Sequence, residues 1–218
     1  MGFFSPENWY WKPFGYVWDA VILSGMWLLG SIPVVTAGAA TTALYDCVAH
    51  CVRGGEKDVL SRFLSTAKRE WKPAFLSTLI WGGALGLGYR MIKAYAAGLP
   101  NTNAGVMAVT ALLFLLTVGI GMFSWVLPLL SRFTFSLGAL NLTALRLAVS
   151  HVFRTILLGL LTVGAILLCL LTWVAFLVVP ELLAVLWAAI MEPVFKKYMT
   201  EEERMAVEKP AEDREDPL

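Results

Sequence analysis

The chain has 218 residues, of which 58% are hydrophobic and only 15% are charged, and its mean hydropathy is +0.70. Ordinary soluble domains carry about 45–50% apolar and about 25% charged residues, so this chain has too few polar groups for a water-exposed surface. Its formal net charge of +1 gives no positive field, and we expect no nucleic-acid partner. The composition predicts an all-α, polytopic transmembrane helical bundle with the lipid bilayer as its solvent.

Apolar segments along the chain predict five membrane spans, near residues 17–35, 73–89, 104–130, 155–179 and 181–198. The uncharged runs at 94–131 and 155–180 contain 38 and 26 residues, and each is long enough to cross the hydrocarbon as a helix. The fifth span is short, because Glu181 and Glu192 bound its uncharged part, and a half-helix or a re-entrant segment is the alternative. Residues 200–218 are charged and poor in apolar residues, which predicts a disordered tail after a transmembrane domain at 1–199.

Two polar segments between the spans predict amphipathic helices on the cytoplasmic side. The first segment, 37–72, contains apolar residues at helical spacing: Val59, Leu60, Phe63, Leu64, Ala67 and Trp71. The Gly54-Gly55 pair separates this helix from an earlier helical piece at 39–52. The second segment, 131–154, places Arg146, Ser150 and Arg154 on one stripe. In the span near 73–89, Gly82-x-x-x-Gly86 predicts close approach of another helix.

The distribution of basic residues predicts the orientation in the membrane. With five spans, fourteen Lys and Arg residues fall on one side and three, Lys12, Arg90 and Lys93, on the other. The side rich in basic residues is normally cytoplasmic. We therefore expect an external N-terminus and a cytoplasmic C-terminus.

Several sequence stretches together resemble the YesL-like family of bacterial integral membrane proteins. The most specific runs from Leu28 to Tyr45 and reads LLGSIPVVTAGAATTALY. Shorter ones are Gly2-Phe3-Phe4, the PLLSRF stretch at 128–133, Phe153-Arg154-Thr155, and EPVFKKY at 192–198. The resemblance covers nearly the whole chain to about residue 199.

The resemblance implies a multi-pass protein of the bacterial cell (inner) membrane. Genes of this largely uncharacterised family often lie beside genes for carbohydrate uptake transporters of the ATP-binding-cassette (ABC) type, so the resemblance implies subunits of such a transporter as partners. It implies no catalytic residues.

The sequence contains no pattern typical of an enzyme. It has two histidines, no G-x-S-x-G elbow and no GxxxxGK[ST] loop, so we expect no catalytic activity and no cofactor. Asp46, Cys47, His50 and Cys51 cluster on one predicted helix, but neighbouring helical positions splay about 100° apart and poorly match a tetrahedral metal site. We interpret this cluster as residues that pack at a helix interface, and we expect no metal.

Acidic residues at membrane depth are candidates for ligand binding or transport, because a charge there is costly. They are Asp19, Glu181 and Glu192. Glu181 and Glu192 lie eleven residues apart, or about three helical turns, and so share one helix face. The alternative is that each carboxylate lies near a span end and reaches the headgroups.

Basic residues on the amphipathic segments are candidates for docking a partner or anionic lipid: Lys57, Arg62, Lys68, Arg69, Lys72, Arg146 and Arg154. Two functions follow from these sets. The first is a non-enzymatic accessory or regulatory partner of a carbohydrate ABC importer. The second is a small-solute transporter or channel in its own right, either as a single chain or as a homo-oligomer. The sequence names neither a substrate nor an oligomeric state.

Overall fold

The computed structural model describes residues 12–33, 36–52, 59–98, 102–133 and 136–198, and the side chains of 12–20 and 51–52 lie outside this description. Every regular element within these ranges is a helix, as expected for an all-α chain. The elements are α1 (Lys12–Ser31), α2 (Ala37–Cys47), the π-helix η2 (Val48–Val52), α3 (Val59–Gly98), α4 (Asn103–Arg132), α5 (Leu137–Ser150), α6 (Val152–Leu171), the 3₁₀-helix η3 (Trp173–Leu177) and α7 (Val179–Tyr198).

Two helices in the described residues, α4 and α6, are long and apolar enough to cross a membrane. Only 6% of the most apolar stretch of α4 and 22% of that of α6 are buried inside the protein. The core helix of a water-soluble protein would hide such a stretch, whereas these helices expose side chains such as Leu115, Leu170 and Leu171. Because exposed apolar surface on this scale is stable against hydrocarbon, the two helices support a membrane location.

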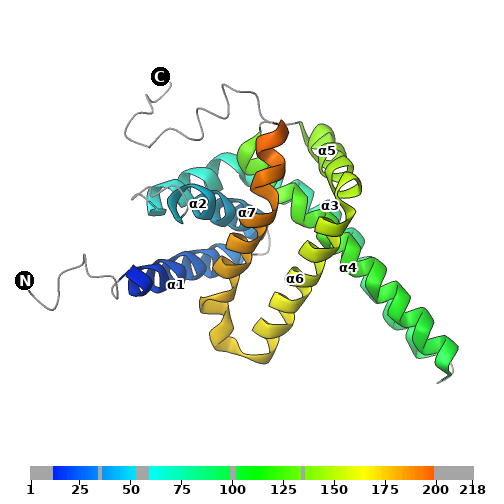
Figure 1. Ribbon diagram of the computed structural model, residues 1–218. Helices are drawn as coiled ribbons and strands as arrows, with labels where there is room; N and C mark the ends of the chain where they lie inside the picture. The colour runs from blue at the N-terminus through cyan, green and yellow to red at the C-terminus, as the bar shows by residue number, and fades with distance from the viewer. Residues whose placement is uncertain (1–11, 34–35, 53–58, 99–101, 134–135, 199–218) are drawn as a thin grey trace, which may run out of the picture.

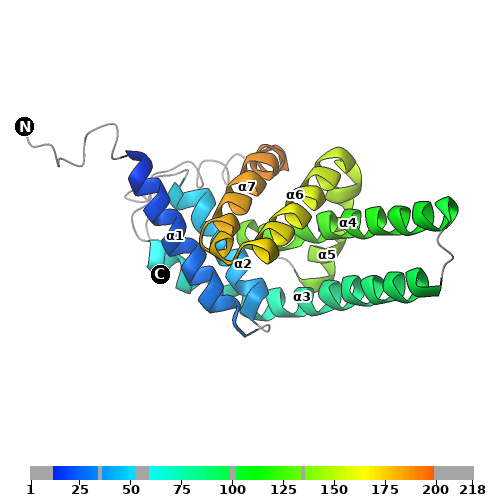
Figure 2. The ribbon, with the colours of Figure 1, turned by 90° about the horizontal axis from the view of Figure 1, so that it is seen from below.

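The helices form a bundle from which one pair projects. Helices α3 and α4 run side by side in opposite directions, and their connected ends extend beyond the other helices (Figures 1 and 2). Helices α6 and α7 form a V that closes at η3 (Figure 1). Helix α2 packs against α1, α3, α4 and α7, so this short helix lies at the centre of the bundle.

The predicted cytoplasmic helix at 59–71 and the predicted span at 73–89 form one continuous helix of 40 residues, α3. The sequence interpretation placed a boundary at Pro73 because proline lacks an N–H and disfavours a helix at the preceding residue. The helix instead continues through Pro73, as α4 does through Pro128 and α7 through Pro193. Apolar helices tolerate proline where neighbouring helices satisfy the backbone groups that it frees.

Other predicted boundaries shift by a few residues. Helix α1 ends at Ser31, just before Pro33, and α4 extends past the expected end near Pro128 to Arg132. The fourth apolar segment, expected to be helical over 155–179, ends as an α-helix at Leu171 and continues as η3. Proline is favoured in the first turn of a helix, and Pro180 lies in the first turn of α7. The expected disordered tail at 200–218 lies outside the described residues.

Aromatic residues build the core where α4, α6 and α7 meet. Trp125 is fully buried, and its ring meets that of Phe195 edge-on with 6.0 Å between centroids. The Trp125 indole N–H donates to the Thr155 hydroxyl at 3.1 Å, and this hydroxyl donates to the Ala148 carbonyl at 2.8 Å. A buried tryptophan needs such an acceptor, and this one fixes α4 against α5 and α6.

Close helix packing occurs at glycines other than those that the sequence indicated. A methyl group at Gly121 on α4 would overlap the Thr155 carbonyl on α6, and one at Gly159 on α6 would overlap the Thr117 carbonyl on α4. At Gly82 and Gly86 a methyl group would meet nothing within 4 Å. The expectation that Gly82-x-x-x-Gly86 is a contact within this chain was therefore wrong, because that face of α3 is exposed.

We expect Gly121→Ala to lower the thermal unfolding midpoint in detergent. The added methyl must separate α4 from α6, and overpacking of this kind costs about 1–3 kcal/mol. Gly83→Ala is the matched control, since it adds the same methyl in open space and should leave stability unchanged or raise it by up to about 1 kcal/mol. Equal midpoints for the two variants would contradict the close crossing of α4 and α6.

Candidate functional site

A chain of buried polar side chains ties the central segment α2–η2 to α3, α4 and α7. We call it the buried charge network, and its members are Tyr45, Asp46, His50, Arg62, Thr66, Arg132 and Glu192. A charge removed from water is costly unless it is paired and hydrogen-bonded, so the arrangement of these partners determines whether the network is stable.

Arg132 and Glu192 form the most buried ion pair of the network. Arg132 is the last residue of α4, and its side chain is 3% exposed. Its Nη2 and Nε donate to Oε1 of Glu192 on α7 at 2.5 and 3.0 Å. The hydroxyl of Tyr45 on α2 donates to the same oxygen at 3.1 Å. Three donors from two helices therefore converge on one carboxylate oxygen of α7.

His50 continues the network from Arg132 toward Asp46. Its Nε2 lies 2.8 Å from Nη1 of Arg132, and its Nδ1 lies 3.1 Å from Oδ1 of Asp46. A guanidinium group only donates hydrogen bonds, so Nε2 of His50 is the acceptor in the first contact. The geometry thus assigns a neutral imidazole whose proton is on Nδ1 and is donated to Asp46.

Asp46 is the acidic centre of the other end of the network and is 2% exposed. Its Oδ2 accepts from Nε of Arg62 and from the hydroxyl of Thr66, both at 2.9 Å. Burial alone raises the pKa of Asp46, but the hydrogen bond from His50 and the charge of Arg62 outweigh burial and hold this pKa well below its ordinary value. Asp46 is therefore ionised at physiological pH.

The local sequence explains how these groups meet. Asp46 and His50 are four residues apart, and so are Arg62 and Thr66, so each pair lies on one helix face. Helix α2 packs against α3 and brings the two faces together. The π-helix η2, which contains His50, directly follows α2, and π-helical turns are frequent at functional sites.

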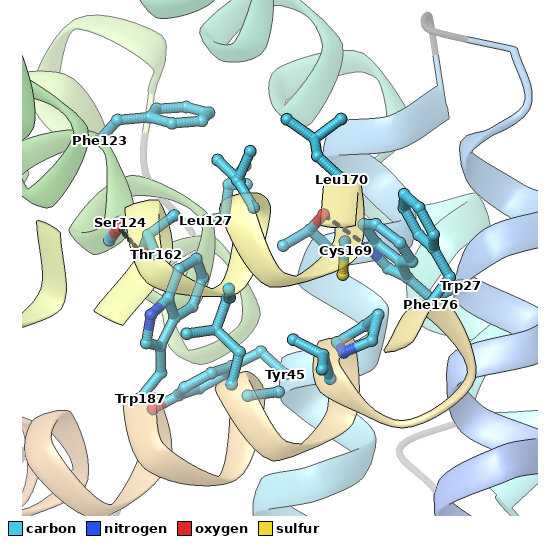
Figure 3. A pocket seen from close by; sticks show the side chains of 17 residues that line it. Trp27, Tyr45, Phe123, Ser124, Leu127, Thr162, Cys169, Leu170, Phe176 and Trp187 are labelled. Carbon is cyan, nitrogen blue, oxygen red and sulfur yellow. Dashed lines mark hydrogen bonds between the residues drawn. The ribbon is translucent and has the colours of Figure 1, made fainter. Parts of the chain in front are cut away.

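A cavity of about 270 Å³ lies beside the network, between α1, α2, α4, α6, η3 and α7. Its walls are mainly apolar (Figure 3). Tyr45 lines the cavity while its hydroxyl binds Glu192, so one residue contacts both the cavity and the buried charge network.

The acidic candidates lie in different places. Glu192 is in the buried charge network. Glu181 is 4% exposed at the start of α7, and its backbone N–H donates to the Ser24 hydroxyl on α1 at 3.3 Å. Both residues lie on the buried face of α7, in agreement with their spacing. The side chain of Asp19 lies outside the described part of α1.

The basic candidates separate into inward and outward groups. Arg62 was expected on the docking face, but it turns inward to pair with Asp46 because that buried carboxylate needs a counter-charge. Lys68, Arg69 and Lys72 are exposed on α3.

Two further basic candidates lie on the segment that follows α4. Arg146 is exposed on α5, and Arg154 is half-buried on α6. Lys57 lies outside the described residues.

Sequence reasoning missed five members of the network: Tyr45, Asp46, His50, Thr66 and Arg132. Asp46 and His50 were interpreted as interface packing, and Arg132 was counted only as a loop charge. A signal was present, since Asp46 is an acid in an otherwise uncharged stretch, 37–49, rich in alanine and threonine. What the sequence did not supply was the partner, because Arg132 lies 82 residues from His50 and 60 from Glu192.

The chemistry available to the network is charge pairing and hydrogen bonding. Within the described residues, no group of three or more His, Cys, Asp or Glu side chains is placed to hold a metal ion. The two carboxylates, Asp46 and Glu192, balance the two guanidinium groups, Arg62 and Arg132. The network therefore joins five elements, α2, η2, α3, α4 and α7, through charged and hydrogen-bonded side chains.

We expect Glu192→Leu and Arg132→Met to destabilise the protein by about 3–5 kcal/mol each, because each strands a buried charge. The double variant should lose much less than the sum, since it removes both charges. Thermal unfolding in detergent measures the cycle. Arg146→Met is the control, because Arg146 is exposed on α5 and substitutions at such surface positions usually change stability by less than about 0.5 kcal/mol. Additive losses at 132 and 192 would refute the buried pair.

Part of the chain matches a known protein family. No curated protein and no solved structure matches the chain. Residues 20–90 match the model of a family described as "Protein of unknown function, DUF624". The matched segment contains α2, η2 and the first part of α3, and with them the Asp46, His50 and Arg62 members of the network. The match covers 71 of the 218 residues, and over this segment the chain is similar to the DUF624 family.

Proposed function

We propose that the protein is a non-enzymatic membrane protein that acts as an accessory or regulatory partner of a carbohydrate importer of the ABC type. The observation that carries this proposal is an exposed stripe on the first half of α3, which combines apolar and basic side chains. We call it the docking stripe, and its residues are Leu60, Leu64, Lys68, Trp71 and Lys72. The importer as the partner comes from the resemblance to the YesL-like family.

The docking stripe has the composition of a protein-binding surface. Leu60, Leu64 and Trp71 are 61%, 48% and 45% exposed, although they belong to the apolar stripe of this amphipathic helix, which would normally be buried. Nζ of Lys72 lies 5.6 Å from the ring centroid of Trp71. Exposed aromatic and aliphatic side chains bordered by charge are typical of sites that bind another protein.

A groove runs along the docking stripe and gives it shape. The groove has a volume of about 420 Å³ between the end of α1, α2 and α3, and its lining includes Leu29, Ala40, Leu64, Lys68 and Trp71. An apolar side chain fits between these residues, and an acidic neighbour pairs with Lys68. The complementary partner is therefore a segment that carries apolar and acidic residues.

Anionic lipid is the alternative occupant of this surface. A helix with Trp, Leu and Lys side chains also lies well at a headgroup interface. Lipid responds to the total charge, whereas a groove selects individual side chains. The two occupants therefore differ in how binding responds to changes at single positions.

We also propose the orientation and the five spans derived from loop charge, in a bacterial cell membrane. The exposed apolar surfaces of α4 and α6 support two of these spans. Three further spans would come from α1, from α3 after Pro73 and from α7. In this arrangement the docking stripe and the basic end of α7, with Lys196 and Lys197, lie in the cytoplasm, where the ATPase subunits of an importer are found.

A second candidate function is transport of a small solute by this chain itself. The observation that favours it is the burial of Glu192 and Arg132 beside a cavity, because ionisable groups inside a membrane bundle are frequently part of a pathway. A homo-oligomer would provide further surface for such a pathway.

Reversal of charge on the docking stripe should remove the partner. We expect Lys68→Glu with Lys72→Glu to reduce co-purification of importer subunits from native membranes at least tenfold, because an acidic segment is then repelled. Arg90→Glu with Lys93→Glu is the matched control, with the same change on exposed residues at the other end of α3. To separate lipid from protein, Leu64→Ser keeps the charge and should also lose the partner. Retention of every importer subunit in both docking-stripe variants would rule out docking here.

The proposed orientation predicts the location of the C-terminus. Alkaline phosphatase is active only outside the cytoplasm, so its fusion after Leu218 should be inactive, while a fluorescent protein at the same position should fluoresce. High phosphatase activity at this position would overturn the five-span arrangement.

Transport by the chain alone predicts solute flux into liposomes that contain only this protein. Glu192→Gln removes the buried charge with little change in volume and should abolish that flux, whereas Glu70→Gln on α3, outside the buried charge network, should not. Equal flux in empty liposomes and in liposomes with the native chain would exclude this second function.

A further inference from the structure

Opposite charges are distributed unevenly between the last residues of the chain and the rest of it. Eight of the sixteen Asp and Glu residues lie within residues 200–218, together with three Lys and Arg residues, so this segment has a formal charge of −5. Residues 1–199 have a formal charge of +6, which gives the net charge of +1. Opposite charges attract each other over about 8 Å at physiological ionic strength, which favours contact wherever a cationic surface lies within reach of this segment.

The first part of this segment also carries apolar residues. Met205 and Val207 stand between the three acids at 201–203 and Glu208. We call residues 200–208 the acidic segment. It combines apolar and acidic side chains, which is the composition that complements the groove of the docking stripe. The chain thus contains a sequence that fits its own exposed surface.

The basic side chains of the docking stripe have no acidic partner within the described part of the chain. Arg69, their neighbour on α3, pairs with Glu70 at 2.7 Å, whereas Lys68 and Lys72 form no ion pair with any described residue. Both lysines are exposed, and Lys68 lines the groove. An acidic peptide that binds here therefore meets two positive charges that no other described group neutralises, beside a groove for its apolar side chains.

The acidic segment is long enough to reach the docking stripe. It begins two residues after the end of α7, and α2 packs against both α7 and α3. Tyr45 on α2 donates to Glu192 on α7, and the next residue, Asp46, accepts from Arg62 on α3. Packed helices lie about 8–10 Å apart, so the axes of α7 and α3 are separated here by at most about 20 Å. Residues 199–207 span about 30 Å when fully extended, which is more than this separation.

We propose that the acidic segment binds the docking stripe of the same chain, with Met205 and Val207 at the groove and glutamates of the segment beside Lys68 and Lys72. The segment then covers the surface on which a partner docks, so a partner must displace it. The contact itself needs no importer, and only this competition rests on the proposed function. In the proposed orientation the acidic segment and the docking stripe are both cytoplasmic, so no membrane separates them.

Photo-crosslinking of the purified full-length protein tests the contact without an importer. The photoreactive amino acid p-benzoylphenylalanine replaces Leu60, which belongs to the docking stripe but does not line the groove, so the groove keeps its side chains. The protein is placed in phosphatidylcholine nanodiscs, and mass spectrometry maps the crosslinks after irradiation. We expect a crosslink from position 60 to residues 201–208. The same label at Leu87, which is exposed on the second half of α3, should give no crosslink to these residues.

An exchange of charges separates a direct contact from an effect on folding. Lys68→Glu with Lys72→Glu should reduce the crosslink at least fivefold, because like charges then face each other. Replacement of the three glutamates at 201–203 by lysine in the same protein should restore at least half of the native yield, a rescue that a misfolded protein does not show. Arg90→Glu with Lys93→Glu is the matched control on α3 and should leave the yield unchanged.

The labelled protein without further substitutions can already overturn the proposal. Crosslinks from position 60 to lipid alone, or no crosslink to residues 201–208, would show that the acidic segment does not cover the docking stripe. In a mixture of isotopically heavy and light protein, crosslinks that join a heavy to a light chain would show that the segment belongs to a second copy. A native yield in Lys68→Glu with Lys72→Glu would show that the two lysines do not hold it.

The competition with a partner is measured separately from the contact. Deletion of residues 200–218 should increase the co-purification of importer subunits from native membranes at least twofold, because the docking stripe is then free. An unchanged recovery of importer subunits would overturn the competition. Recovery of no importer subunit with or without these residues would refute the proposed function, while the crosslink from position 60 would still decide whether the acidic segment binds.

Discussion

The arrangement of the bundle depends on the hydrogen bonds that the guanidinium group of Arg132 donates. This group is placed at the end of α4, is almost wholly buried, and donates to Glu192 on α7 and to His50 on η2. No other side-chain type could serve both contacts equally well, because a lysine presents a single point charge and arginine a planar fork of donors. Elements that are far apart in the sequence are thus joined at one charged group. Helix α2 is also held at the centre, because Arg62 and Thr66 on α3 donate hydrogen bonds to its carboxylate, Asp46.

The class of fold was predictable from composition, because chemistry averaged over many residues decides it. The all-helical structure and the two strongly apolar helices follow from long uncharged runs, and the exposed surfaces of α4 and α6 agree with a lipid environment. Boundaries at proline were less predictable. Local propensity favours the end of a helix before Pro73. Helix α3 nevertheless continues through Pro73, because packing against neighbouring helices outweighs that local preference. The open face at Gly82 and Gly86 shows the same limit, since a small residue permits a close contact without specifying a neighbour.

The site was predictable only in part, because its members are brought together by tertiary packing. Glu192 was identifiable from the cost of burying a charge, and its burial agrees with that argument. The partners of Glu192 were not identifiable from the sequence. An arginine at the end of a span looks there like an ordinary loop charge, and only the fold shows that it lies beside a carboxylate. Arg62 shows the converse: its position on an amphipathic helix suggested a surface role, and the inward carboxylate of Asp46 reassigns it. The cavity leaves no pattern in the sequence, because its walls come from six elements.

The continuity of α3 has a mechanical consequence. At 1.5 Å per residue, 40 helical residues form a rod about 60 Å long, which exceeds the thickness of a bilayer of about 40–45 Å with its headgroups. In the proposed five-span arrangement, such a rod would have to protrude from the bilayer or tilt within it. Helix α4 lies along its far half, and α2 grips its near half. The two halves of α3 therefore pack against different partners, although they belong to one helix.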